Sequence, residues 1–238
     1  MSRPDPGEAG LDPELRRQVL RESFAVGVAT GAYGISFGAL AVAAGLDVWQ
    51  AQALSLLMFT GGSQFAFVGI MANGLSAAPA AVTAASMLGI RNSLYALELT
   101  QLLRPRGLRR AAAAQLTIDE STAVAALQED DRASRLGFWV TGSTIFVLWN
   151  LSTLLGALAG NALGDPRAWG LDAAAAAAFT ALLWPRLKHG DAVAIAVLAA
   201  VVAVVLTPAL PAGLPVVVAA SAALLAWRAP RKARGETA

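Results

Sequence analysis

Residues 49–73 have the sequence WQAQALSLLMFTGGSQFAFVGIMAN, an apolar run with glycine and polar residues at its centre. The run is long enough to cross a bilayer, which takes about 20 mostly apolar residues, but Gly61, Gly62, Ser63 and Gln64 interrupt it. Backbone groups freed by such a break are tolerated at membrane depth only where protein or a water-filled cavity satisfies them. The sequence therefore predicts one broken membrane helix or two half-helices.

The rest of the chain predicts an all-α, polytopic membrane protein. Of the 238 residues, 56% are hydrophobic and 14% are charged, against about 25% charged residues in ordinary soluble domains. Further apolar segments cover residues 23–44, 77–103, 137–163, 171–185, 192–207 and 214–227. Six spans follow if residues 49–73 re-enter and residues 111–127 stay at the inner face, and eight follow if both segments cross.

Basic residues predict the orientation of the chain. Residues 1–22 are too charged to begin a secretory signal peptide, so we expect a cytoplasmic arm there, then a single transmembrane transport domain at 23–228 and a basic cytoplasmic tail at 229–238. The arm, the loop at 104–110 and the residues from Arg228 onward each contain four Arg or Lys. The positive-inside rule places all three, and so both termini, in the cytoplasm.

A short echo points to an internal repeat within the transport domain. The tripeptide Gly-Leu-Asp at 45–47 recurs at 170–172. Transporters are often built from repeats with the substrate site at the repeat interface. In a chain this rich in alanine, chance similarity explains the echo equally well.

Missing residue types exclude several functional classes. The chain has no Cys and only one His, His189, so we expect no disulfide, no Cys/His metal site and no thiol nucleophile. The phosphate-loop and H-E-x-x-H motifs are also missing. The net charge of +2 does not indicate nucleic acid, because the charges lie between apolar blocks. We therefore predict neither an enzyme nor a nucleic-acid-binding protein, and no cofactor.

The break at 61–64 is the first candidate substrate site. A half-helix that starts there would point backbone N–H groups and the positive end of its dipole into a cavity, which suits a carboxylate. Ser63 and Gln64 can add side-chain hydrogen bonds. The alternative is that small residues only permit close helix packing and that the polar ones satisfy a neighbour.

Charged residues inside apolar segments supply further candidates. Arg91 and Glu98 are seven residues apart and share one helix face, which the cost of charge in lipid should turn toward the bundle interior. Asn92 and Tyr95 are neighbours on an adjoining stripe. The alternative is that Arg91 snorkels or forms a purely structural pair with Glu98.

Asp119 and Glu120 make residues 111–127 a poor span and favour an amphipathic or partly inserted helix. Carboxylates near an apolar boundary can carry protons, although a solvated helix face is an equally simple interpretation. Trp149 and Asn150 are polar points in an apolar run, and such residues more often serve packing than ligand contact.

Four stretches together resemble the AzlC family, which comprises the large subunits of bacterial branched-chain amino acid exporters. They are GAYGISFGALAVAAGL at 31–46, MFTGGSQF at 58–65, GIRNSLYALEL at 89–99 and LTIDES at 116–121. The family usually has alanine where this chain has Gly62, and Asn, His and Gly where it has Gly89, Asn92 and Ala96. The missing histidine puts a proton-coupling role at that position in doubt.

The resemblance implies export of Leu, Ile, Val and often Met across the bacterial inner membrane. Export would be driven by the proton motive force and would need a small hydrophobic membrane subunit of the AzlD type. A scaffold subunit without its own substrate path, or a transporter of another small solute, are the alternatives. We expect substrate contacts from Gly61, Gly62, Ser63, Gln64, Arg91, Asn92 and Tyr95, and proton coupling by Glu98, Asp119 and Glu120.

Overall fold

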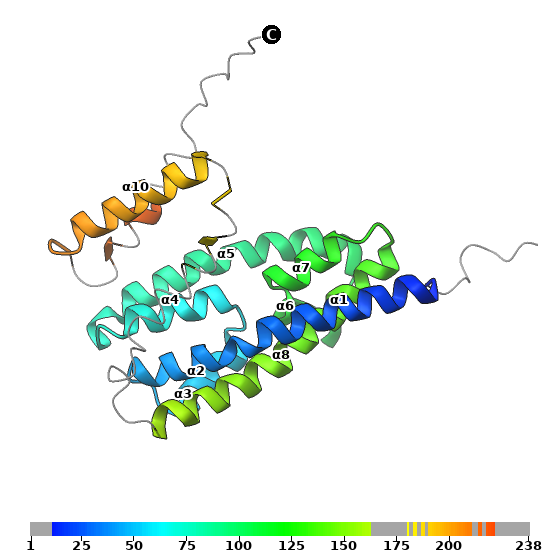
Figure 1. Ribbon diagram of the computed structural model, residues 1–238, viewed down its shortest axis with the longest axis horizontal. Coiled ribbons are helices and arrows are strands. Elements are labelled where there is room, and N and C mark those ends of the chain that lie inside the picture. The colour runs from blue at the N-terminus through cyan, green and yellow to red at the C-terminus, as the bar shows by residue number, and fades with distance from the viewer. Residues whose placement is uncertain are drawn as a thin grey trace, which may run out of the picture.

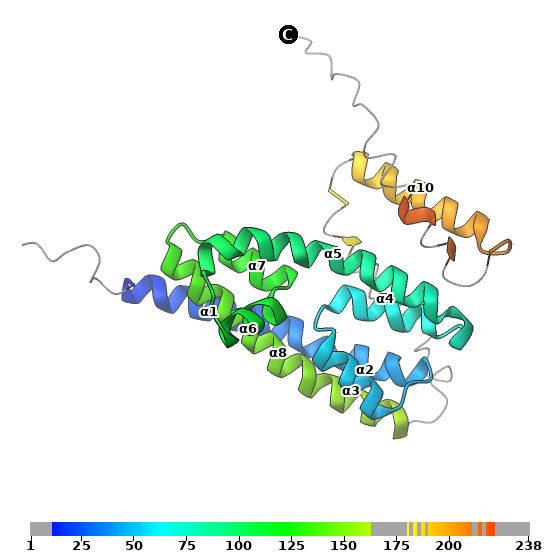
Figure 2. The same cartoon turned by 180° about the vertical axis from the view of Figure 1, so that it is seen from behind.

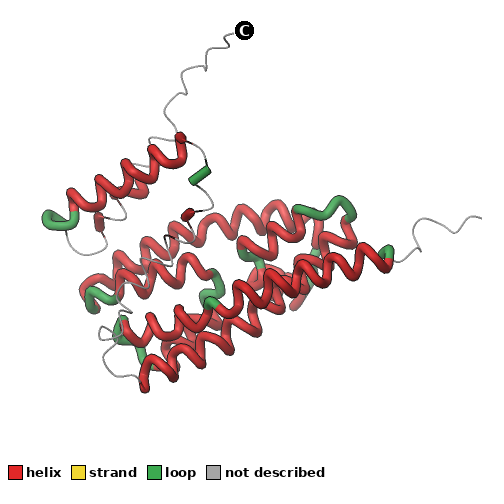
Figure 3. The backbone as a smooth tube through the Cα atoms, viewed as in Figure 1, coloured by secondary structure: helices red, strands yellow, loops and turns green. Residues whose placement is uncertain are grey.

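The computed structural model describes residues 11–162, 180, 183–184, 187–188, 190–210, 214–215 and 218–221. These residues form helices and no strand, as predicted (Figure 3). Figure 1 shows an elongated bundle, with α10 apart from it on the α5 side. The helices are α1 (Pro13–Ala32), α2 (Gly34–Ala43), α3 (Val48–Leu57), α4 (Gly61–Met71), α5 (Ala78–Leu103), α6 (Leu108–Leu116), α7 (Asp119–Ala126), α8 (Asp131–Ala162) and α10 (Gly190–Leu206), with a short 3-10 helix at Leu75–Ala77.

Helices α1 and α2 form one long rod with a turn at Tyr33. The rod begins at Pro13 because the Asp12 carboxylate accepts hydrogen bonds from the N–H groups of Glu14 and Leu15, at 2.8 and 3.1 Å. An acidic N-cap followed by proline is a strong helix start. The helix therefore begins ten residues before the predicted start of the apolar span at residue 23.

Helix α8 packs along this rod, and glycines determine how closely the two approach. A Cβ added at Gly38 would overlap the carbonyl oxygen of Thr153, and one added at Gly156 would overlap that of Ile35. Small residues allow such backbone contact between membrane helices. The first part of the chain is thus assembled against α8.

Helices α3 and α4 form a hairpin that turns back inside the bundle (Figure 2). Helix α3 starts at the end where α2 finishes, the chain reverses at residues 58–60, and α4 returns to that end. There Ala44 packs against the cluster that contains Ile70 and Met71. Residues 49–73 therefore form two half-helices, which is one of the two predicted arrangements.

Polar side chains attach α3 to α8. The Ser55 hydroxyl lies 3.2 Å from that of Thr153, with both side chains buried. Gln52 donates from Nε2 to Oδ1 of Asn150 at 3.4 Å. Such side-chain bonds hold membrane helices together where no hydrophobic effect acts between them.

Helices α6 and α7 form a second hairpin, which enters from the opposite end of the bundle (Figure 2). The sequence predicts one helix over 111–127, but the structure divides it at residues 117–118. The cause is Ser121, whose Oγ accepts from the Ile118 N–H at 3.1 Å and donates to the Leu116 carbonyl at 2.6 Å. These bonds hold Ile118 in an extended conformation between the two helices.

The bundle contains two units, each a long helical segment followed by a hairpin. The first unit is the α1–α2 rod followed by the α3–α4 hairpin, and the second is α5 followed by the α6–α7 hairpin, running in the opposite direction (Figures 1 and 2). The hairpin tips meet where Gln115 Nε2 donates to the Leu56 carbonyl at 2.8 Å. The second copy of the predicted echo of residues 45–47, at 170–172, lies outside the described residues.

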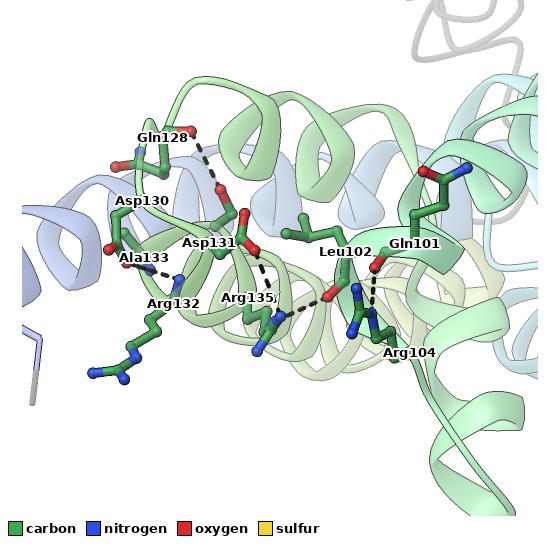
Figure 4. Close-up of polar contacts among 10 residues, drawn as sticks. Gln101, Leu102, Arg104, Gln128, Asp130, Asp131, Arg132, Ala133 and Arg135 are labelled. Carbon is green, nitrogen blue, oxygen red and sulfur yellow. Dashed lines mark hydrogen bonds and ion pairs between the residues drawn. The ribbon is translucent and has the colours of Figure 1, made fainter. Parts of the chain in front are cut away.

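Basic residues gather at one end of the bundle (Figure 4). Near the start of α8, Arg135 Nε donates to the Leu102 carbonyl of α5 at 2.8 Å, and the Arg135 guanidinium lies 3.7 Å from Asp131. The start of α1 and the loop at 104–110 lie at the same end (Figure 1). This placement agrees with the predicted common side for the arm and the loop, whereas the tail at 229–238 lies outside the described residues.

Among the described residues, two helices are long and apolar enough to cross a membrane, Pro13–Ala43 and Asp131–Ala162. Helix α5 has 26 residues, about 39 Å at 1.5 Å per residue, but it carries charged residues in its interior. Helix α10 is a shorter apolar helix. The predicted spans at 171–185 and 214–227 fall largely outside the described residues.

Candidate functional site

A cavity of about 440 Å³ lies between the two chain reversals and the middle of the long helices. Its wall is mainly apolar with a few charged groups, which is the usual composition of a site for a small molecule. The lining residues are Ala29, Thr30, Tyr33, Phe59, Thr60, Gly61, Gly62, Phe65, Leu88, Arg91, Ile118, Asp119, Glu120, Ile145, Trp149 and Leu183.

The N-terminus of α4 forms one side of this cavity. Thr60 precedes it in an extended conformation, and no side chain caps the helix. The first N–H groups of a helix have no acceptor within it, so those of Gly61 and Gly62 and the positive end of the helix dipole face the cavity wall. A Cβ at Gly62 would lie 2.8 Å from Arg91 Nη2, and one at Gly61 would lie 3.2 Å from Trp149 Cη2. Glycine therefore keeps this end of the helix accessible.

Arg91 and Asp119 form an ion pair at the cavity wall, with 2.9 Å between Nη1 and Oδ2. Their side chains are 29% and 27% exposed. Arg91 comes from the middle of α5, and Asp119 is the first residue of α7. The positive end of the α7 dipole favours the Asp119 carboxylate and disfavours the Arg91 guanidinium beside it. The pair thus brings opposite charges to one wall.

Glu98 does not pair with Arg91. Seven residues correspond to about 10.5 Å along a helix, and the second hairpin delivers Asp119 directly to the Arg91 guanidinium. Glu98 is exposed and does not line the cavity. The expectation that Arg91 and Glu98 both face the bundle interior is therefore corrected: Arg91 lines the cavity and Glu98 lies on the outer surface of the described helices.

Ser63 and Gln64 lie behind the cavity wall rather than on it. Gln64 is fully buried and donates from Nε2 to the Leu54 carbonyl of α3 at 3.3 Å. Ser63 is also buried, with Oγ 3.6 Å from where a Cβ of Gly89 would lie. Both side chains face neighbouring helices because each residue is turned 100° further around the helix than the one before it, away from Gly61 and Gly62 at the cavity wall. The Gln64 amide nitrogen thus satisfies a neighbouring helix, whereas Ser63 Oγ and Gln64 Oε1 have no hydrogen-bond partner among the described residues.

The remaining predicted residues divide between the wall and its surroundings. Glu120 lines the cavity beside Asp119. Asn92 and Tyr95 are half-buried on α5 and do not line it. Among the described residues, no group of three or more His, Cys, Asp or Glu side chains could hold a metal ion.

Aromatic residues on the wall were not among the predicted site residues. Trp149 of α8 is 4% exposed and stacks on Phe37 with 6.2 Å between ring centroids. Phe65 meets the Trp149 ring edge-on at 6.1 Å and the Tyr33 ring at 6.4 Å. Because these aromatic residues lie within apolar segments, the sequence does not distinguish them from ordinary core residues. The one available signal was their position, since Tyr33 and Phe65 lie within the GAYG and GGSQF motifs.

Residues 25–163, more than half of the chain, match the family model described as AzlC protein. The chain belongs to the AzlC family. The match runs from α1 to the end of α8 and includes every residue on the cavity wall except Leu183. No curated protein and no solved structure matches this AzlC protein significantly. Family membership and the apolar helices together indicate a membrane protein with a transport-related function rather than an enzyme.

Proposed function

We propose that this AzlC protein exports branched-chain amino acids, namely Leu, Ile and Val, with Met as a further substrate, across the bacterial inner membrane. Export is coupled to protons and depends on a small hydrophobic AzlD-type membrane subunit. The observation that carries the proposal is the cavity, where a bare helix N-terminus and two carboxylates meet within an apolar wall.

The cavity suits the three parts of such a substrate. The N–H groups of Gly61 and Gly62 would receive the α-carboxylate, as helix N-termini receive anions. Asp119 and Glu120, on the opposing hairpin, would receive the α-ammonium group. The apolar remainder of the wall would accommodate an aliphatic side chain. A volume of about 440 Å³ is within the range of about 300 to 1,000 Å³ that is usual for small-molecule sites.

Proton coupling would use the carboxylates at the start of α7. Arg91 pairs with Asp119 in this state, and an incoming ammonium group would compete with the guanidinium for that carboxylate. Glu120 lies on the same wall, and either Asp119 or Glu120 would take up the proton. Glu98, which is exposed, stays a prediction without support from the cavity geometry.

Amino acid efflux tests the proposal directly. Cells are loaded with a leucine-containing dipeptide, and leucine release is measured with this chain alone, with an AzlD-type small membrane subunit alone, with both and with neither. We expect efflux only with both, and we expect a protonophore to abolish it. Unchanged efflux with both proteins present in the membrane would favour the scaffold or other-solute alternatives.

A further inference from the structure

We infer that Trp149 limits the size of the substrate side chain that the cavity accepts. The inference rests on the proposed function, because it assumes that the cavity binds an amino acid. Trp149 lines the cavity, and its Cη2 atom lies 3.2 Å from where a Cβ of Gly61 would be. The indole therefore borders the helix end at which the α-carboxylate is proposed to bind. An amino acid held there has its side chain one carbon away from that carboxylate, next to the ring.

The indole is held rigidly, so the limit it sets is firm. Phe37 stacks on it with an interplanar angle of 24°, and Phe65 packs edge-on at 86°. Phe37 and Phe65 are themselves buried and lie 5.8 Å apart. Offset stacking and edge-to-face contacts are the preferred aromatic arrangements, and close-packed side chains do not move aside without cost.

The Trp149 side chain has a second feature that packing does not explain. Its Nε1 atom is buried and has no hydrogen-bond partner among the described residues. Buried N–H groups in native structures nearly always have one, whereas phenylalanine would fill a purely structural position without this cost. The Trp149 ring thus lines the cavity with an N–H group that has no partner among the described residues, and both its size and this donor act where the substrate is proposed to bind.

Substitution of Trp149 should change substrate selectivity rather than abolish binding. The test is binding of labelled leucine to the purified protein with its small subunit, in competition with Ala, Val, Leu, Phe and Trp. For W149L we expect the affinity for Phe, relative to Leu, to rise about tenfold or more, because each methylene-sized change in an apolar pocket corresponds to about 10- to 200-fold discrimination. W149F should also raise the affinity for Phe relative to Leu, but by less. It replaces W149L as the test variant if W149L does not fold.

W139L is the matched control, because Trp139 is on the same helix and does not line the cavity. The relative affinities should stay as in the wild type. Suppose that the wild type binds leucine, and that W149L and W149F fold but keep the wild-type ratio of Phe affinity to Leu affinity. The inference is then overturned while the proposed function stands. If the wild type binds none of these amino acids, the proposed function fails and this inference fails with it.

Discussion

Arg91 and Asp119 provide the sharpest test at the scale of single residues. Replacing either by alanine removes this ion pair from a partly buried place. We expect each variant to lose about 1 to 3 kcal/mol of stability, between the values for exposed and for buried pairs. The measurement is thermal unfolding in detergent. The double alanine variant should lose less than the sum of the two single losses, and strict additivity would show that the pair is not coupled.

The sequence predicts some residues of the site and not others, for a physical reason. Gly61, Gly62, Arg91, Asp119 and Glu120 are unusual at membrane depth, so composition alone singles them out, and all five line the cavity. Which charges pair depends on how a distant hairpin folds back, and no local spacing reveals it. The direction of a side chain such as Gln64 likewise depends on the exact helix start. Periodicity predicts that start only to within a residue or two.

At the scale of helices, the contact between α2 and α8 makes a strong prediction. A methyl group at Gly156 would meet backbone atoms of Ile35, which cannot rotate away as a side chain could. We expect Gly156→Ala to cost about 3 kcal/mol, at the upper end for overpacking, and to lower the thermal midpoint and the amount of protein in the membrane. Gly190→Ala is the control, since no atom lies within 4 Å of its added Cβ. Equal behaviour of the two variants would contradict the close packing.

The α3–α4 hairpin makes a second prediction at this scale. Gln64→Ala removes the bond to the Leu54 carbonyl and leaves that acceptor without its side-chain donor. The Leu54 carbonyl still accepts from the Met58 N–H at 2.9 Å, so we expect a loss of about 0.5 to 1.5 kcal/mol of stability. The effect on leucine affinity should be smaller than that of Asp119→Asn. Gln101→Ala, at an exposed position, should change neither quantity. A large loss of affinity at unchanged stability would instead return Gln64 to the binding site.

The two chain reversals differ in how well the sequence predicts them. Gly61 and Gly62 mark the first, because glycine and polar residues inside an apolar run weaken a helix. The second lies at Thr117 and Ile118, within a run that is helical by composition, and depends on one hydroxyl, that of Ser121. A single serine carries little weight in a pattern, so the sequence predicts an unbroken helix there.

At the scale of the whole molecule, the re-entrant hairpins predict the sidedness of two turns. Asn73 and Arg106 are both exposed and lie at opposite ends of the bundle, after the first hairpin and before the second. The chain has no cysteine, so Asn73→Cys and Arg106→Cys each introduce a single label site. An impermeant thiol reagent should label residue 73 from outside intact cells and residue 106 only after the cells are opened. Labelling of both from the same side would exclude this arrangement.

The attachment of α3 to α8 determines when this protein can finish folding. The partners of Gln52 and Ser55 are each 98 residues further along the chain, roughly 5 to 20 seconds of synthesis at 5 to 20 residues per second. During that interval the first hairpin is inserted with its polar face unsatisfied, and the cavity does not yet exist. Chains that end before α8 should therefore be recognised as unfinished and degraded, however apolar they are.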